Sequence, residues 1–177
     1  MVDLTFEKFM NQAESIKTGE LVAIIATLPK IFEIKFDFKP TRWNNNDYTS
    51  LIHFNDKHKK NHGWGSRIPA VFVNEQKLSI SFGVDGEYNW HIKSARLFLH
   101  KWHTTKITQI YKSGVYLSKI YHDGVLLSSK PNSKAKEFHD VQIWAGDDFY
   151  EAQAGVIRSL SVSGKIMILF SVFLFHF

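Results

Sequence analysis

The sequence has 177 residues and is 44% hydrophobic and 15% aromatic, with 10 glycine and 4 proline residues. This length suits one domain with a substantial core, and the apolar content excludes a disordered chain. The sequence contains no cysteine, which excludes a disulfide framework, a thiolate metal site and a cysteine nucleophile. The net charge is +5, and Lys57, Lys59 and Lys60 form a basic cluster. We interpret this cluster as a solvated loop and expect no nucleic-acid partner.

The two ends of the chain differ from its middle. Residues 1–19 are expected to form a polar N-terminal extension, in which Thr5–Lys17 is predicted to form one or two helical turns. No signal peptide is visible there, because the basic start, apolar stretch and small-residue cleavage site are missing. Residues 164–177 are expected to form an apolar C-terminal tail. Its apolar stretch is shorter than the ~20 residues that span a bilayer, so we expect no membrane span. An additional edge strand and an alternative transcript end both remain open for this tail.

Alternation of apolar and polar residues is the main structural signal in chain order. Phe32–Phe38 alternates with charged residues until Pro40, and Leu78–Val84 alternates in the same way. This period of two predicts half-buried strands. Asp85-Gly86 and Asp123-Gly124 tolerate the positive φ angles of tight turns and therefore predict hairpins. Short strands separated by turns indicate an all-β sandwich or barrel. Further strands are predicted at Leu21–Leu28, Thr49–Phe54, Ala70–Val73, Ala95–Leu99, Thr104–Tyr111, Val115–Tyr121, Val125–Ser128, Val141–Ala145 and Val156–Val162.

The order of four segments resembles a known family, the laminin-G-like members of the concanavalin A-like lectin/glucanase superfamily. The resemblance implies an antiparallel jelly-roll β-sandwich over residues 20–163. It also implies an extracellular protein that binds carbohydrate or an extracellular protein partner through the loops at one rim. The four segments are Phe32–Phe38 ending in Lys39-Pro40-Thr41, Ser50–Phe54 followed by Gly65–Ala70, Leu97–Trp102, and the closing stretches Tyr121–Val125, Val141–Asp147 and Gly155–Leu160.

Calcium is a cofactor that the resemblance implies, because laminin-G-like domains often hold one Ca²⁺ near the rim. Calcium takes six to eight oxygen ligands, which loops at strand ends can supply together. Asp147 and Asp148 are the candidate ligands. The alternative interpretation is a solvated loop in which Asp147 caps a turn.

Aromatic residues in predicted loops are the candidates for ligand binding, because an exposed ring can stack on a sugar. Trp64 lies between two glycines and close to Arg67, whose guanidinium suits a carboxylate or sulfate. Trp64 folding back over the core is the alternative interpretation. The predicted ligand-binding residues are Trp64, Arg67, Tyr48, Trp90, Phe149 and Tyr150.

Enzymatic chemistry is not expected, although a glycoside hydrolase on the same fold is one alternative. Related glucanases place three carboxylates on one strand, where they act as nucleophile and acid. Here Glu33 and Asp37 share a strand face, but Lys35 lies between them and no third carboxylate follows. A structural or adhesive domain of a larger extracellular protein is a further alternative.

The histidines do not predict a metal site. His58 and His62 have the i, i+4 spacing that binds a metal only on a helix, and their segment reads as a loop. His100 and His103 flank Trp102 and are interpreted as a surface pair where a strand begins. The oligomeric state does not follow from the sequence.

Overall fold

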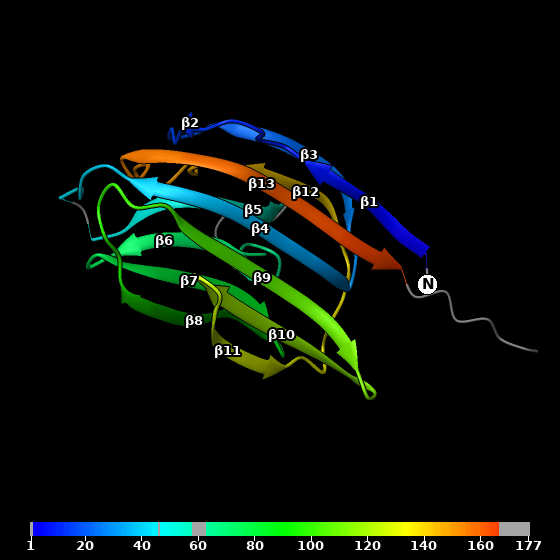
Figure 1. Ribbon diagram of the computed structural model, residues 1–177. Coiled ribbons are helices and arrows are strands. Elements are labelled where there is room, and N and C mark those ends of the chain that lie inside the picture. Colours follow the sequence, from blue (N-terminus) through cyan, green and yellow to red (C-terminus); the bar gives the residue numbers. More distant parts are fainter. Residues whose placement is uncertain (1, 46, 58–62, 167–177) are drawn as a thin grey trace, which may run out of the picture.

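In a computed structural model, the chain forms two antiparallel β-sheets that stack face to face (Figure 1). The structure describes residues 2–45, 47–57 and 63–166. None of these residues lies in a helix, so the expected all-β sandwich is confirmed. Within the same ranges, no helix is long and apolar enough to cross a membrane.

The first sheet has β4 near its centre, between β13 and β9. Its strand order is β1-β13-β4-β9-β10-β11, and the short strand β2 also pairs with β13. The strands are β1 (Val2–Lys8), β2 (Glu14–Ser15), β4 (Ile31–Pro40), β9 (His103–Lys112), β10 (Val115–His122), β11 (Val125–Pro131) and β13 (Gly155–Ile166).

The second sheet lies behind the first in Figure 1, and its strands also pair antiparallel. Its order is β3-β12-β5-β6-β7-β8. The strands are β3 (Leu21–Leu28), β5 (Thr49–Asp56), β6 (Ala70–Asn74), β7 (Lys77–Val84), β8 (Glu87–Arg96) and β12 (Phe138–Trp144).

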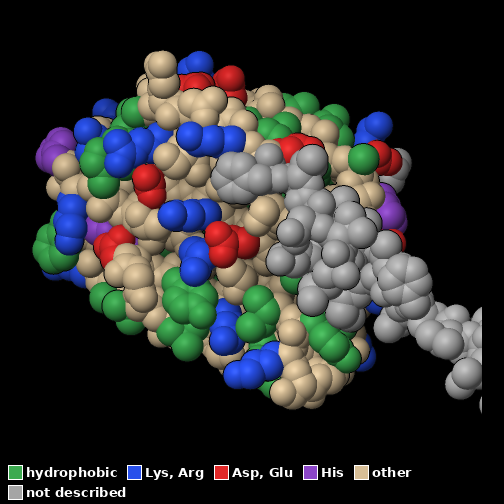
Figure 2. Space-filling model, turned by 45° about the vertical axis from the view of Figure 1, so that its right-hand side comes forward, with side chains coloured by type: hydrophobic (Ala, Val, Ile, Leu, Met, Phe, Trp, Pro, Cys, Tyr) green, Lys and Arg blue, Asp and Glu red, His purple; other side chains and the backbone are tan. Residues whose placement is uncertain are grey.

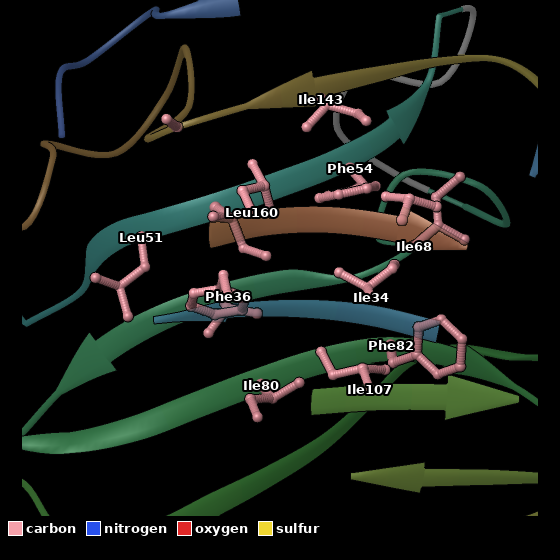
Figure 3. Packing of buried hydrophobic residues seen from close by; sticks show 14 of the residues in the cluster. Ile34, Phe36, Leu51, Phe54, Ile68, Ile80, Phe82, Ile107, Ile143 and Leu160 are labelled. Atoms are coloured by element: carbon pink, nitrogen blue, oxygen red, sulfur yellow. The ribbon is translucent and has the colours of Figure 1, made fainter. Parts of the chain in front are cut away.

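One apolar core fills the space between the sheets, and β4 shows why. Ile34 pairs with Val162 on one side and Ile107 on the other, so apolar side chains line up across three strands. Successive side chains of a strand point to opposite faces, so the alternation of β4 buries its apolar set and leaves its charged set outside. Core side chains from both sheets face one another in Figure 3: Ile34, Phe36, Ile107 and Leu160 from the first sheet, and Leu51, Phe54, Ile80, Phe82 and Ile143 from the second.

Both predicted hairpin turns are confirmed. Asp85 and Gly86 have φ angles of 55° and 87°, and they join β7 to β8. Asp123 and Gly124 have φ angles of 47° and 81°, and they join β10 to β11. Positive φ at both central residues matches the twist of the flanking strands, which explains why Asp-Gly occurs at both turns.

Two local predictions are wrong. The predicted N-terminal helix is absent, because β1 and β2 instead pair with the edge of β13 and so satisfy their backbone groups. Met10 and Ile16 are buried beside this edge, which accounts for the apolar residues of the segment. The predicted strand at Ala95–Leu99 ends at Arg96. Of the apolar C-terminal stretch, Ile166 ends β13, and residues 167–177 lie outside the described residues.

Truncating the core is expected to weaken the packing of one sheet on the other. Phe36→Ala should lower the free energy of unfolding by about 3–5 kcal/mol, because it removes a fully buried ring and leaves a cavity. Urea unfolding at 25 °C, followed by tryptophan fluorescence, measures the change. Leu126→Ala is the control, since Leu126 is exposed on β11 and its loss should cost little. Equal losses from the two substitutions would contradict the placement of the core.

Candidate functional site

The loop between β12 and β13 is shaped by one buried carboxylate. Asp147 is 1% exposed, and its Oδ1 accepts hydrogen bonds from the backbone N–H of Phe149 at 2.8 Å and Tyr150 at 2.6 Å. Asp147 therefore caps this turn, as Asp side chains often do. The backbone N–H of Ser50 also donates to the carbonyl of Glu151 at 2.8 Å, which holds the loop along β5.

The second oxygen of Asp147 faces a buried histidine. Oδ2 lies 3.6 Å from His53 Nδ1 and is buried with no hydrogen-bond partner among the described residues. His53 Nε2 is 2.6 Å from the carbonyl oxygen of Ser66 and donates to it. Burial lowers the pKa of His53, and the nearby Arg67 adds to this. The Ser66 hydrogen bond and the carboxylates of Asp147 and Asp148 oppose the shift without reversing it.

Two of the six predicted ligand-binding residues, Tyr48 and Tyr150, come together at this rim, where their ring centroids lie 6.3 Å apart. Phe149 precedes Tyr150 in the same loop and borders a separate small recess with Trp144. Tyr48, Phe149 and Tyr150 are 37%, 51% and 37% exposed. The ring centroids of Tyr48 and Tyr150 lie 5.9 and 4.9 Å from that of Phe72 on β6. We call Tyr48, Phe72 and Tyr150 the rim aromatic cluster. Exposed apolar groups that gather on a soluble protein mark binding surfaces more often than scattered ones do.

A polar recess of about 180 Å³, which we call the rim recess, is lined in part by residues that neighbour this cluster in the chain. Gln153 fixes one wall, since its Oε1 accepts from the Thr49 hydroxyl at 2.6 Å and its Nε2 donates to the Arg42 carbonyl at 2.7 Å. Sequence reasoning did not single out Thr49 or Gln153 as site residues, because no local pattern shows that the segments around positions 44, 75 and 153 meet. The lining residues are Trp43, Asn44, Asp47, Thr49, Val73, Glu75, Gln76 and Gln153.

The other three predicted residues lie elsewhere, around Gly83 at the end of β7. The Lys136 ammonium lies 5.5 Å from the Trp64 ring centroid, and the Lys130 ammonium lies 5.3 Å from that of Trp90. Arg67 donates a hydrogen bond to the side chain of Asn89. These side chains are therefore already engaged by neighbouring residues, and Trp64 packs partly against the core.

The carboxylates considered for hydrolysis are paired on the outer face of the first sheet. Asp37 Oδ2 is 3.3 Å from Arg158 Nε, and its Oδ1 accepts from the Thr104 hydroxyl at 2.8 Å. Glu33 is 3.9 Å from the Lys106 ammonium. Figure 2 shows one face of the molecule, on which basic and acidic side chains intermix.

The candidate calcium ligands differ in their surroundings, because Asp147 is buried and Asp148 is exposed. Calcium at this pair stays a prediction.

A different group of side chains does converge within the described ranges: the ligand atoms of His103, His122 and Asp123 all lie within 4.8 Å of one another. The interpretation of His103 as a surface residue is wrong, since it is 2% exposed. Its ring lies on the core side of β9, 5.4 Å from the Phe38 ring.

A second recess, on another part of the molecule, is less suited to a sugar. It has a volume of about 430 Å³ and lies between residues of β3 and the end of β13. Its lining includes Glu7, Pro29, Glu137 and His139 but no Phe, Tyr or Trp. It therefore offers no broad aromatic face for stacking.

No protein-family model matches the sequence, and neither does any curated protein. Solved structures, however, share the fold. The chain is 13% identical to the Ruminococcus gnavus IT-sialidase CBM40 bound to α2,3-sialyllactose, with a TM-score of 0.54. The alignment covers 90% of this chain and 95% of the CBM40. The botulinum neurotoxin type G receptor-binding domain is 15% identical, with a TM-score of 0.55. Domains LG4-5 of the mouse laminin α1 chain are 15% identical, with a TM-score of 0.51.

The extent of these matches differs. The alignments cover 93% and 88% of this chain, but 43% of the toxin domain and 41% of the laminin chain. This chain thus spans less than half of those two proteins and almost all of the CBM40. At such low identity the likeness shows the fold alone. That fold is the jelly-roll sandwich that the sequence predicted.

The buried His53 gives an expected pH dependence. A pKa held below the ordinary 6.5 means that the unfolded chain takes up a proton that the folded chain refuses. The free energy of unfolding should therefore fall as the pH drops below about 6.5, until the folded pKa is passed. His53→Gln, which can still donate to Ser66, should make the fall between pH 7 and pH 5 smaller. Urea unfolding across this range measures it.

The matched control is His139→Gln, because His139 is an exposed histidine on β12. It should keep the pH dependence of the unsubstituted protein. A pH dependence that His53→Gln leaves unchanged would show that His53 protonates equally in both states.

Proposed function

We propose that this protein is a non-enzymatic recognition module of the laminin-G-like kind that binds glycans at the rim recess and the rim aromatic cluster. The observation that carries the proposal is that two exposed tyrosine rings and a polar recess lie at the same end of a jelly-roll sandwich, on the loops before β5 and after β12. Apolar rings and hydrogen-bonding groups at one place match the two kinds of surface that a sugar presents.

The chemistry of the recess suits sugar hydroxyls. Asp47, Glu75 and Gln76 line it with carboxylate and amide groups, which accept or donate hydrogen bonds. Trp43 supplies an aromatic wall. Tyr48 lies between Asp47 and Thr49 in the chain, and both of these neighbours line the recess. Small-molecule sites commonly combine apolar walls with a few placed polar groups in this way.

The pre-formed geometry of the site also supports binding. Asp147, with its two backbone hydrogen bonds, fixes the loop that carries Phe149 and Tyr150. Thr49 and Gln153 are buried and hydrogen-bonded to each other. A site held in its binding conformation loses less conformational entropy when a ligand binds.

Similar structures favour a glycan over other ligands. The Ruminococcus gnavus CBM40 is described in complex with α2,3- and α2,6-sialyllactose. A Trypanosoma rangeli sialidase is also similar, but this chain matches only 21% of it. The pairing of Glu33 with Lys106 and of Asp37 with Arg158 supports binding without hydrolysis, because neither carboxylate is arranged with a second one as acid and nucleophile. An extracellular location is part of the proposal.

Removing the exposed rings should weaken glycan binding. A glycan array with neutral and sialylated sugars identifies a ligand, and calorimetry then gives its dissociation constant. Tyr150→Ala and Tyr48→Ala should each raise that constant at least about tenfold, which corresponds to ~1.4 kcal/mol of lost contact. Tyr88→Ala on β8 is the matched control, because Tyr88 is similarly exposed but lies outside the cluster. Titrations with calcium and with a chelator test the Asp147–Asp148 prediction separately.

Two results would overturn this proposal. Failure of every glycan to bind would remove the function. Binding that is lost in Trp64→Ala or Arg67→Ala but kept in Tyr150→Ala would move the site to the surroundings of Gly83.

A further inference from the structure

Three potential metal ligands meet where β9 begins and β10 ends. His103 is the first residue of β9, His122 is the last residue of β10, and Asp123 follows in the turn to β11. The pairing of His122 with Thr105 sets the two histidines on neighbouring strands. Their rings are stacked, with centroids 5.3 Å apart and planes 20° from parallel. Long-range pairing of the strands, which no local sequence pattern reveals, thus creates the group.

The distances between ligand atoms fit one small cation. Asp123 Oδ2 lies 2.8 Å from His103 Nδ1 and 3.6 Å from His122 Nε2. Ligands at about 2.0–2.1 Å from a tetrahedral Zn²⁺ are about 3.3 Å from each other. The two observed distances lie on either side of this value, so a shift of a few tenths of an ångström would bring both to it.

The groups around the ligands hold them in this orientation. The backbone N–H of Thr104 donates to Asp123 Oδ1 at 2.8 Å, which leaves Oδ2 toward the histidines. His122 Nδ1 is 3.4 Å from the Thr105 hydroxyl, and His103 Nε2 is 3.3 Å from the backbone of Phe98. In metal sites, the second nitrogen of a ligating imidazole is typically held by such a partner, which directs the first nitrogen at the metal.

The site is enclosed on one side and open on the other. Phe38 packs against both histidine rings, with centroids 5.4 and 6.3 Å away. The Asp123 side chain is 37% exposed and gives access from solvent. Imidazole nitrogen with one carboxylate oxygen suits first-row divalent metals such as zinc, whereas calcium and magnesium prefer oxygen alone.

We propose that His103, His122 and Asp123 bind one Zn²⁺, which joins the start of β9 to the β10–β11 turn and keeps a fourth position open to solvent. Because no ligand of this site belongs to the rim aromatic cluster or the rim recess, the zinc proposal stands apart from the glycan proposal.

Zinc binding is tested with Zn²⁺ alone on the full chain, with His58 and His62 replaced by Gln so that neighbouring histidines do not add a second site. Calorimetry should give one Zn²⁺ per chain. A Zn²⁺ concentration of 100 times the dissociation constant should raise Tm by about 5 °C or more. His122→Gln and Asp123→Asn should each weaken the affinity at least about tenfold. Co²⁺ in place of Zn²⁺ should show the visible absorption of a low-symmetry, four-coordinate ion.

The control substitution is His139→Gln, an exposed histidine outside the group. It should leave the stoichiometry, the affinity and the Tm shift unchanged. Asp123→Asn keeps the acceptor for Thr104 and lies in an exposed turn, so it decides the test even if a buried histidine variant fails to fold. No stoichiometric binding, or equal binding by His122→Gln, Asp123→Asn and the control, would leave only a hydrogen-bonded His–Asp pair and overturn the proposal.

Discussion

Packing of two apolar sheet faces against each other holds this molecule together, and β4 shows how. Phe36 and Ile34 come from a strand with a neighbour on each side, and both are fully buried. Complete burial of one such side chain contributes roughly 1.5–3 kcal/mol. A surface ion pair such as Arg158–Asp37 contributes about 0–1 kcal/mol. The charged outer face is therefore a consequence of the sandwich and not its cause.

The rim depends on that core through a small number of buried polar groups. Asp147 and Gln153 belong to a loop outside the strands, yet both are almost completely buried. Their hydrogen bonds to backbone groups replace the strand pairing that a loop lacks. The backbone that carries the exposed rings of Phe149 and Tyr150 is thus held in place by these hydrogen bonds. The same logic applies to Asp123, whose hydrogen bond to Thr104 fixes the turn beside His103 and His122.

The fold was largely predictable because its signal is local. Alternation over Phe32–Phe38 predicts a strand from only a few residues. The Asp-Gly pairs predict the hairpin turns in the same way. The prediction of a helix in the N-terminal segment was wrong because the conformation of this segment is decided by its pairing with β13, far away in the sequence. Propensity within a short segment cannot include the backbone partners that a sheet edge offers.

The site was predictable only in part, for the same reason. Exposed aromatic residues in loops could be named, but not which loops meet. Tyr48 and Tyr150 come together because β5 and the loop after β12 lie side by side. Trp64 instead packs partly against the core and lies beside the Lys136 ammonium. His103 looked like a surface residue beside Trp102, and only the register of β9 on β4 shows that it faces the core.

The most direct measurement of the central claim is nuclear magnetic resonance of the ¹⁵N-labelled protein during titration with a glycan that the array identifies. We expect the largest shifts at the backbone amides of Tyr48, Phe149, Tyr150 and Gln153, with those of Glu87–Trp90 unchanged. Shifts concentrated around Trp64 and Arg67, or spread evenly over both sheets, would contradict a glycan site at this rim.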